Sequence, residues 1–353
     1  MFIVDAHLDI AYNALSYGRN QRLPLAQVRA QEAASSRGIP IVTLPELQKG
    51  NVSLVFGTLF VMPTTRNVTG LDTGKVYRTP GEAHAQAMEQ LDYYHRLADE
   101  IESIRLVTDN ASLDAVLASH QADATAPLLG IVPLMEGADP IREAEEVEQW
   151  YARGLRLIGL AWDDTRYAAG AWRGGGGLTT EGYRLLDVMA GFNFIADLTH
   201  MSERASLETM ERYPGPVVAT HSNVRALVPG ERQLSDTQIR LLGERNGVIG
   251  IVLFNRFLKA EYSKGDPKQS VTLEQVVAHI DHICQLLGSA AHVGIGSDFD
   301  GGFGAGDIPA ELDSAADYAQ VAVKLREKGY APADIDGIMG GNWINLLRRT
   351  WGA

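Results

Sequence analysis

Short apolar segments alternate with helical patterns along the chain, and this alternation predicts an α/β protein built as a (β/α)8 TIM-like barrel. About eight of the apolar segments have the length and the β-branched content of parallel strands that are buried on both faces. The chain has 353 residues, of which 45% are hydrophobic, so it can bury a core of this size. An open, doubly wound sheet is the alternative architecture. Because no low-complexity linker interrupts the pattern, we predict a single domain over residues 1–353.

The elements follow one another in a regular order. Strands are predicted at residues 2–4, 53–61, 127–135, 155–162, 194–200, 216–221, 247–254 and 293–298. Helices are predicted at residues 81–101, 141–151, 180–189, 236–244 and 273–287, and one more ends at Arg212. The polar residues 64–80 are expected to form a loop over a site, and the helices after Ser314, including residues 333–349, are expected to pack outside the barrel.

The composition excludes several classes of function. A formal net charge of -13 and a pI of about 5.2 argue against a nucleic-acid-binding protein, because phosphate contacts need clustered Lys and Arg. The sequence shows no apolar stretch of membrane-spanning length and no secretory signal at Met1, which together predict a cytoplasmic protein without a membrane partner. The single cysteine, Cys284, excludes an intrachain disulfide.

Potential metal ligands follow the predicted strands at the point where each strand ends. They come from five different strands and are His7, Asp9, Glu136, His200, His221 and Asp298. The carboxyl ends of all strands of a barrel meet at one rim, so we expect these side chains to converge there. Buried imidazoles and carboxylates are costly unless they are paired or bind a metal. A hydrogen-bonded network of structural residues is the alternative interpretation.

Three histidines and two carboxylates can hold a pair of divalent ions if one carboxylate bridges them. Glu136 is the best candidate for the bridge, because it is central in the strand order. A bridged metal pair lowers the pKa of a shared water and can polarise a carbonyl group. Asp298 would then accept the proton of that water and return it to the leaving amine. Asp300 shares its segment, but a salt bridge or a turn explains it equally well.

The motifs as a set resemble the membrane dipeptidase (renal dipeptidase) family of zinc peptidases, which belongs to the amidohydrolase-like barrels. The resemblance spans almost the whole chain and is carried by Asp5-Ala6-His7-Leu8-Asp9, Met135-Glu136-Gly137, Asp197-Leu198-Thr199-His200-Met201-Ser202, Thr220-His221-Ser222-Asn223, Gly294-Ile295-Gly296-Ser297-Asp298-Phe299-Asp300-Gly301 and Gly340-Gly341-Asn342-Trp343. It implies two Zn²⁺ ions, or another divalent metal. By this resemblance, one zinc is held by His7 and Asp9 and the other by His200 and His221, with Glu136 as the bridge.

The resemblance also assigns residues to the substrate. It implies that Arg232 binds the terminal carboxylate, a task that suits a guanidinium fork. Trp162 occupies the position of a family histidine that contacts the scissile carbonyl, and an indole can donate one hydrogen bond but cannot carry a proton. Carbonyl polarisation would then fall to the metal or to the neighbouring Asp163. The family's tyrosine after the seventh strand is missing from Phe254-Asn255-Arg256, where Asn255 is the expected substrate contact.

The sequence therefore predicts a metal-dependent dipeptidase that cleaves dipeptides with a free carboxylate by means of a metal-bridging hydroxide. Hydrolysis of another small amide, such as an N-acyl amino acid or a lactam, is one alternative, and a non-catalytic metal-binding barrel is another. The resemblance leaves a homodimer open. His279 and His282 lie three residues apart on a predicted helix and are expected to face solvent.

Overall fold

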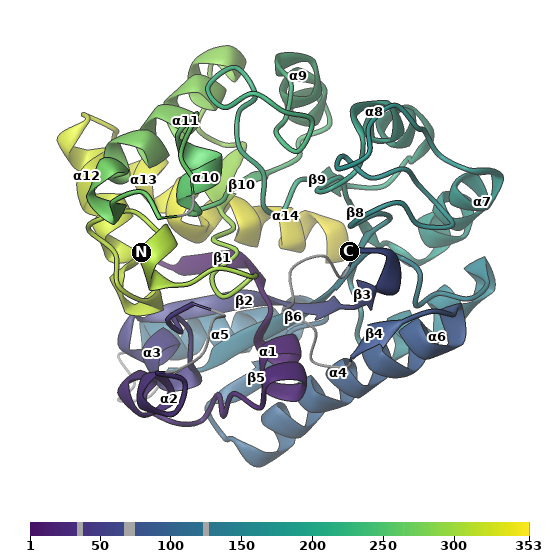
Figure 1. The fold of residues 1–353 in the computed structure, drawn as a ribbon, viewed down its shortest axis with the longest axis horizontal. Coiled ribbons are helices and arrows are strands. Elements are labelled where there is room, and N and C mark those ends of the chain that lie inside the picture. The colour runs from purple at the N-terminus through teal and green to yellow at the C-terminus, as the bar shows by residue number, and fades with distance from the viewer. Residues whose placement is uncertain (34–37, 67–74, 123–126, 264, 353) are drawn as a thin grey trace.

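The computed structural model describes residues 1–33, 38–66, 75–122, 127–263 and 265–352, so part of the predicted loop at residues 64–80 lies outside the described residues. Within these ranges, eight parallel strands follow one another around a ring in the order β10-β11-β1-β2-β6-β7-β8-β9, with helices arranged around them (Figure 1). The strands are β1 (Ile3–Leu8), β2 (Val52–Phe60), β6 (Leu129–Glu136), β7 (Leu157–Gly159), β8 (Ile195–Asp197), β9 (Val217–Val218), β10 (Ile249–Ile251) and β11 (Val293–Ile295).

The ring is closed by a parallel bridge between Ala219, which follows β9, and Ile249 in β10. This contact joins the two ends of the strand order and excludes an open sheet, so the (β/α)8 barrel is confirmed. A further strand, β5 (Ile104–Leu106), pairs with the beginning of β6. The short strands β3 (Met62–Pro63) and β4 (Val76–Tyr77) form a separate pair.

The helices expected at residues 81–101, 180–189, 236–244 and 273–287 and the helix expected to end at Arg212 have bounds close to those predicted, and further helices accompany them. The longer ones are α1 (Ile10–Tyr17), α4 (Pro80–Glu100), α5 (Asn110–Gln121), α7 (Thr180–Met189), α8 (Glu203–Arg212), α9 (Asp236–Glu244), α11 (Leu273–Leu287), α12 (Ala319–Glu327) and α14 (Asn342–Trp351). The shorter ones are α2 (Leu25–Gln31), α3 (Leu44–Lys49), α6 (Val147–Ala152), α10 (Asn255–Leu258) and α13 (Pro332–Asp336). Only residues 147–151 of the helix predicted at 141–151 are α-helical, because a 3-10 turn precedes them.

The C-terminal helix α14 lies outside the strands and crosses the middle of the ring in Figure 1. Its apolar face, which includes Trp343 and Leu347, packs against strand residues such as Val4, Phe56 and Leu134 in one buried cluster. The indole N–H of Trp343 donates to the carbonyl oxygen of Ile295 at 3.2 Å. The helix therefore closes the amino-terminal end of the barrel and leaves the carboxyl end open for a site.

His279 on α11 is fully buried, so the expectation of a solvent-facing histidine pair is wrong. Its Nδ1 accepts from the backbone N–H of Val224 at 3.1 Å, and its Nε2 lies 3.3 Å from the carbonyl oxygen of Leu258. The helical spacing places both histidines near one face, but only His282 reaches a partly exposed partner, Asp236. No helix within the described ranges is both long and apolar enough to cross a bilayer.

Candidate metal centre

Five strands bring the predicted ligands to the carboxyl end of the barrel. His7 belongs to β1 and Asp9 follows it, Glu136 is the last residue of β6, and the other ligands come shortly after β8, β9 and β11. Three overlapping groups have ligand atoms within 4.8 Å of one another: His7 with Asp9 and Glu136, Glu136 with His200 and His221, and His7 with His221 and Asp298. The structure therefore brings all six predicted residues together.

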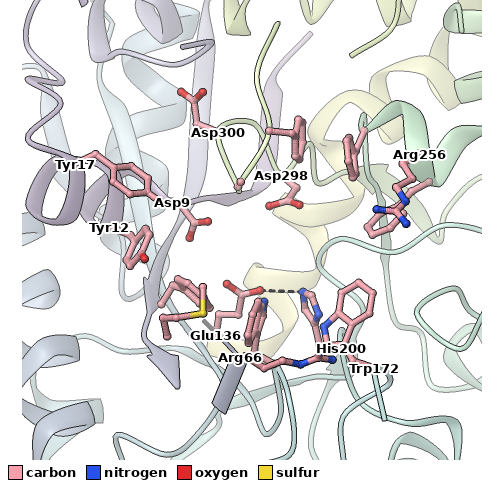
Figure 2. Close-up of a pocket in the computed structure, with 18 residues that line it drawn as sticks. Asp9, Tyr12, Tyr17, Arg66, Glu136, Trp172, His200, Arg256, Asp298 and Asp300 are labelled. Atoms are coloured by element: carbon pink, nitrogen blue, oxygen red, sulfur yellow. Dashed lines mark ion pairs between the residues drawn. The ribbon is translucent and has the colours of Figure 1, made fainter. Parts of the chain in front are cut away.

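The two oxygens of the Glu136 carboxylate face different histidines. Oε2 lies 3.5 Å from Nε2 of His7, whereas Oε1 lies 3.1 Å from Nε2 of His200 and 3.4 Å from Nε2 of His221. The ion pair between Glu136 and His200 is drawn in Figure 2. Each oxygen is thus part of a separate ligand group, which is the arrangement that a bridging carboxylate needs.

The placement of the histidine nitrogens suits ligands of a cation better than partners in a hydrogen bond. Both ring nitrogens of His7 and the Nδ1 of His200 are buried without a hydrogen-bond partner among the described residues. Nε2 of His200 and Nε2 of His221 are only 2.9 Å apart. Two imidazole nitrogens bound to one tetrahedral zinc at about 2.0–2.1 Å would be separated by about 3.3 Å, so the spacing and the donor set suit a shared cation.

Buried acidic residues beneath the ligands fix the strand ends. Asp5 accepts hydrogen bonds from the backbone N–H and the hydroxyl of Ser297 at 2.8 and 2.6 Å, and another from Tyr318. Asp197 accepts four hydrogen bonds from the N–H and hydroxyl groups of Thr199 and Thr220 at 2.5–3.1 Å. Each carboxylate therefore ties together the neighbouring strand ends that carry ligands, and such outer contacts hold ligands in place.

The backbone is strained where three of the strand-end residues enter the site. His200, Asp298 and Asp300 have positive φ angles of 66°, 60° and 65°. Residues with side chains seldom adopt this left-handed conformation, and it is concentrated at functional sites. The sharp turn directs the side chains of His200 and Asp298 into the mouth of the barrel (Figure 2).

Burial and charge set the protonation of the ligands. Burial, assisted by the charge of Arg232, lowers the pKa of His200 to about 3, and burial also holds the pKa of His221 well below its usual value. Both imidazoles are therefore neutral near pH 7, which leaves a lone pair for a metal. Although burial opposes the charged form, His7 and the other histidines hold the pKa of Glu136 well below its usual value. Glu136 is thus ionised.

Asp298 has the opposite character. Burial raises its pKa well above the usual value, and the carboxylates of Asp9 and Glu136 raise it further. Its Oδ1 lies 3.8 Å from Nε2 of His7. A carboxyl group whose pKa is raised in a cleft takes up a proton more readily than a free carboxyl group, which suits a general acid or base.

A cavity of about 410 Å³ opens directly above this centre. Asp9, Glu136, His200 and Asp298 line its floor and face a common space in Figure 2. Asp300 lines the edge, but its carboxylate points away from the other acids and accepts from the N–H groups of Ile41 and Val42. Arg19 also lies 3.3 Å from it, so Asp300 has a structural role.

The four residues expected to contact the substrate do not all lie at the cavity. Trp162 lines the cavity, and its indole N–H has no partner among the described residues. Arg232 is buried behind the lining, and its guanidinium donates to the carbonyl oxygen of His221 at 2.9 Å and lies 3.3 Å from Nε2 of His200. Its Nε has no partner within the described part of the chain.

Asp163 and Asn255 do not line the cavity, and the side chains of both residues have other partners. The carboxylate of Asp163 is occupied by Arg173 at 2.7 Å and by Arg66 at 2.9 Å, so it cannot polarise a substrate carbonyl. The amide nitrogen of Asn255 donates to the carbonyl oxygen of Ile308 at 3.1 Å, which anchors α10 instead. Both residues are next to cavity residues in the sequence, but their side chains contact these other partners instead of lining the cavity.

Several residues of the site were not found from the sequence. Thr58 in β2 donates its hydroxyl to Oδ1 of Asp9, and a hydroxyl in the apolar run 53–61 was the available signal. Arg66, Trp172 and Arg256 also line the cavity, but they come from segments without a recognisable motif. Only the folded chain shows that these segments border the metal ligands.

A parallel barrel that gathers buried histidines and carboxylates at its carboxyl rim has the fold and the side chains of a metal-dependent hydrolase. The chain belongs to the membrane dipeptidase family (Peptidase family M19), whose sequence model matches residues 1–351. It is therefore a peptide hydrolase that depends on a divalent metal.

The individual relatives agree with this assignment. The chain is 27% identical over 356 residues to an uncharacterized dipeptidase of Schizosaccharomyces pombe, covering 99% of this chain and 80% of the relative. It is 27% identical over 311 residues to dipeptidase aclJ of Aspergillus oryzae, covering 87% and 69%.

Solved structures share the fold. The crystal structure of dipeptidase AC superposes with a TM-score of 0.82 at 24% identity and covers 100% of this chain and 99% of that chain. A metallopeptidase from Rhodobacter sphaeroides, liganded with a phosphinate mimic of the dipeptide L-Ala-D-Ala, superposes with a TM-score of 0.81 at 23% identity and covers 99% of both chains.

Proposed function

We propose that the protein is a binuclear zinc dipeptidase that hydrolyses dipeptides with a free C-terminal carboxylate. The observation that carries the proposal is the placement of Glu136, whose two oxygens face two separate histidine groups. His7 and Asp9 would hold one ion, His200 and His221 the other, and Glu136 both. Two such ions lower the pKa of bound water and polarise a carbonyl when they are present.

Asp298 is proposed as the proton carrier. Its raised pKa favours uptake of a proton from the attacking water, and the carboxyl group can then deliver that proton to the leaving amine. It lines the cavity beside His7, so it can reach both the water and the scissile bond.

Arg232 and Trp162 are proposed to position the substrate. Arg232 has a donor at Nε without a described partner and lies beside His200, where it can bind a carboxylate after a small movement. Trp162 lines the cavity, and its indole N–H can donate one hydrogen bond to the substrate. Its ring also excludes water from the space above His200, 6.1 Å away.

The test is release of amino acids from a panel of L,L and L,D dipeptides, N-acyl amino acids and a lactam, comparing zinc-loaded with chelated protein. Metal-dependent cleavage confined to dipeptides is the expected result. Cleavage of only the acyl or lactam compounds would keep the proposed chemistry and change the substrate, as the tryptophan in place of a histidine allows.

Substitution of Asp298 tests the proton transfer. We expect Asp298→Asn to bind metal normally and to lose turnover by about a factor of 10³, because the amide cannot accept a proton. Metal content and kcat are measured on the same preparation. Full turnover of this variant would rule out the role proposed for Asp298.

A further inference from the structure

Aromatic rings in contact with one another line one side of the cavity. Tyr17 and Tyr12 on α1 have ring centroids 5.4 Å apart, and Tyr12 lies 4.9 Å from Phe60 at the end of β2. Phe60 contacts Trp162 at 5.0 Å, and Trp162 lies 6.1 Å from His200. All four of these rings line the cavity.

The ring contacts continue on the other side of the metal centre. Trp172 lies 5.8 Å from His200 and 6.5 Å from Phe257 on α10. Phe257 contacts Phe254 at 5.2 Å, and Phe254 stacks on Phe303 at 4.3 Å. These four rings also line the cavity, and with the first four they form what we call the aromatic belt.

The belt supplies eight of the side chains that line the cavity. Between its two ends, Phe303 and Tyr17, the lining consists of Asp300, Gly301 and Gly302. The carboxylate of Asp300 is already occupied by backbone N–H groups and by Arg19. Above the ionisable floor, the wall therefore offers mainly ring faces and edges to a bound molecule.

Trp172 is the most informative member of the belt. It is 41% exposed although it stands beside a metal-group histidine. Exposed large apolar side chains at a cavity mouth are typical of binding sites, because a ligand removes them from water. The guanidinium of Arg66 lies over the ring at 5.9 Å and is anchored by Asp163, which limits the movement of the indole.

We propose that the aromatic belt selects dipeptides with aromatic side chains, and that Trp172 is a specificity-determining residue. This inference rests on the proposed dipeptidase function. Rings of the substrate would gain edge-to-face or stacked contacts in addition to burial of apolar surface. Small side chains would leave the wall partly hydrated, and charged side chains would lose water against the rings.

Arg256 provides the competing possibility. It lines the mouth, is exposed and forms no ion pair within the described ranges, so it could instead favour acidic side chains. However, Arg256 is a single cation at the rim, Arg66 is already paired with Asp163, and eight aromatic rings line the same cavity. The belt therefore argues for aromatic substrates over acidic ones.

The decisive measurement is kcat/KM of the zinc-loaded protein for Ala-Ala, Leu-Leu, Phe-Phe and Glu-Glu. We expect Phe-Phe to exceed Ala-Ala by about tenfold or more, with Leu-Leu between them and Glu-Glu lowest. Equal values, or a preference for Ala-Ala or Glu-Glu, would overturn the inference and leave the dipeptidase function intact.

Variants of Trp172 test the assignment of the residue. Trp172→Ala is expected to lower the ratio of Phe-Phe to Ala-Ala cleavage by about fivefold to tenfold, and Trp172→Phe to restore part of it. Tyr183→Ala is the matched control, because it removes an exposed ring from α7 that does not line the cavity. An unchanged ratio in Trp172→Ala would contradict the role of Trp172.

Binding to Asp298→Asn separates substrate class from catalysis. In this variant, calorimetric titration with Phe-Phe and Ala-Ala measures affinity without turnover. An affinity at least about tenfold higher for Phe-Phe supports the inference, even if the native protein cleaves no dipeptide. Absence of dipeptide cleavage would refute only the proposed function. Equal affinities would refute the substrate class independently of any activity.

Discussion

The two ends of the barrel are built from the same strands but have opposite chemistry. At the amino-terminal end, α14 packs Trp343 and Leu347 against Val4 and Phe56 in an apolar cluster, and these four side chains are fully buried. At the carboxyl end, the strands finish in buried imidazoles and carboxylates with left-handed backbone, next to an open cavity.

The contrast shows how one strand serves both stability and chemistry. Buried apolar side chains lower the free energy of the folded state, whereas buried ionisable groups raise it unless a partner compensates. Gly294 in β11 illustrates the tight fit at the amino end, because a Cβ there would lie 2.1 Å from Nε1 of Trp343. We therefore expect substitutions at the amino end to alter stability and substitutions at the carboxyl end to alter metal binding and turnover.

Glu136→Gln should have the largest effect at the carboxyl end. The amide retains the shape but cannot bridge two cations, so kcat/KM should fall by about 10³-fold or more while the far-UV spectrum remains native. Metal content per chain, determined by elemental analysis, should decrease in parallel. Retention of two metal ions with normal turnover would show that Glu136 is not the bridge.

Trp343→Ala should have the largest effect at the amino end. Removing a fully buried indole should lower the free energy of unfolding by about 3–5 kcal/mol, without changing the turnover of the protein that remains folded. Urea denaturation measures the change. Trp172→Ala is the matched deletion at the carboxyl end, where 41% exposure predicts a loss of about 1 kcal/mol or less. Similar losses for both variants would remove the proposed contrast.

His279 tests whether a buried histidine outside the metal group costs stability on acidification. Burial lowers the pKa of His279 to about 4, against 6.5 for an unperturbed histidine, so between these values the unfolded chain binds a proton that the folded chain rejects. Stability should be fully present above pH 6.5 and should fall by about 3 kcal/mol as pH drops to 4.

The comparison with His279→Phe isolates this contribution, since all other groups titrate equally in both proteins. The variant should be less stable at pH 7, because the N–H of Val224 loses its acceptor, but its pH dependence between 6.5 and 4 should be flatter. Chemical denaturation in the presence of a chelator at several pH values measures both. Parallel curves would mean that His279 does not titrate differently in the two states.

The smallest expected effect concerns the support of a single ligand. Thr58→Val keeps the shape of the strand residue but removes the hydroxyl that donates to Asp9, so metal affinity should fall by about tenfold. Competition with a chelator of known affinity gives the value. Ser53→Ala in the same strand is the control, because Ser53 contacts His120 at the opposite end and should not affect the metal.

The sequence predicted the barrel and the six converging ligands because both depend on local patterns. The apolar runs mark the strands, and polar residues at their ends are recognisable without knowing the partners, as at Glu136 and His200. The direction of an individual side chain was not predictable in this way. Asp163 and Asn255 lie beside cavity residues, but their side chains contact Arg173 and Ile308 instead, and His279 follows a helical spacing yet is buried.

The succession of strands along the chain, the ionisable residues at their ends and the family motifs could thus be predicted from the sequence alone, since they depend on periodicity and residue type. The continuity of the aromatic belt was decided only by the tertiary structure. Tyr12, Trp172 and Phe303 are separated by more than a hundred residues from one another and carry no shared motif. They line one cavity because barrel closure brings the loops of different strands to the same rim.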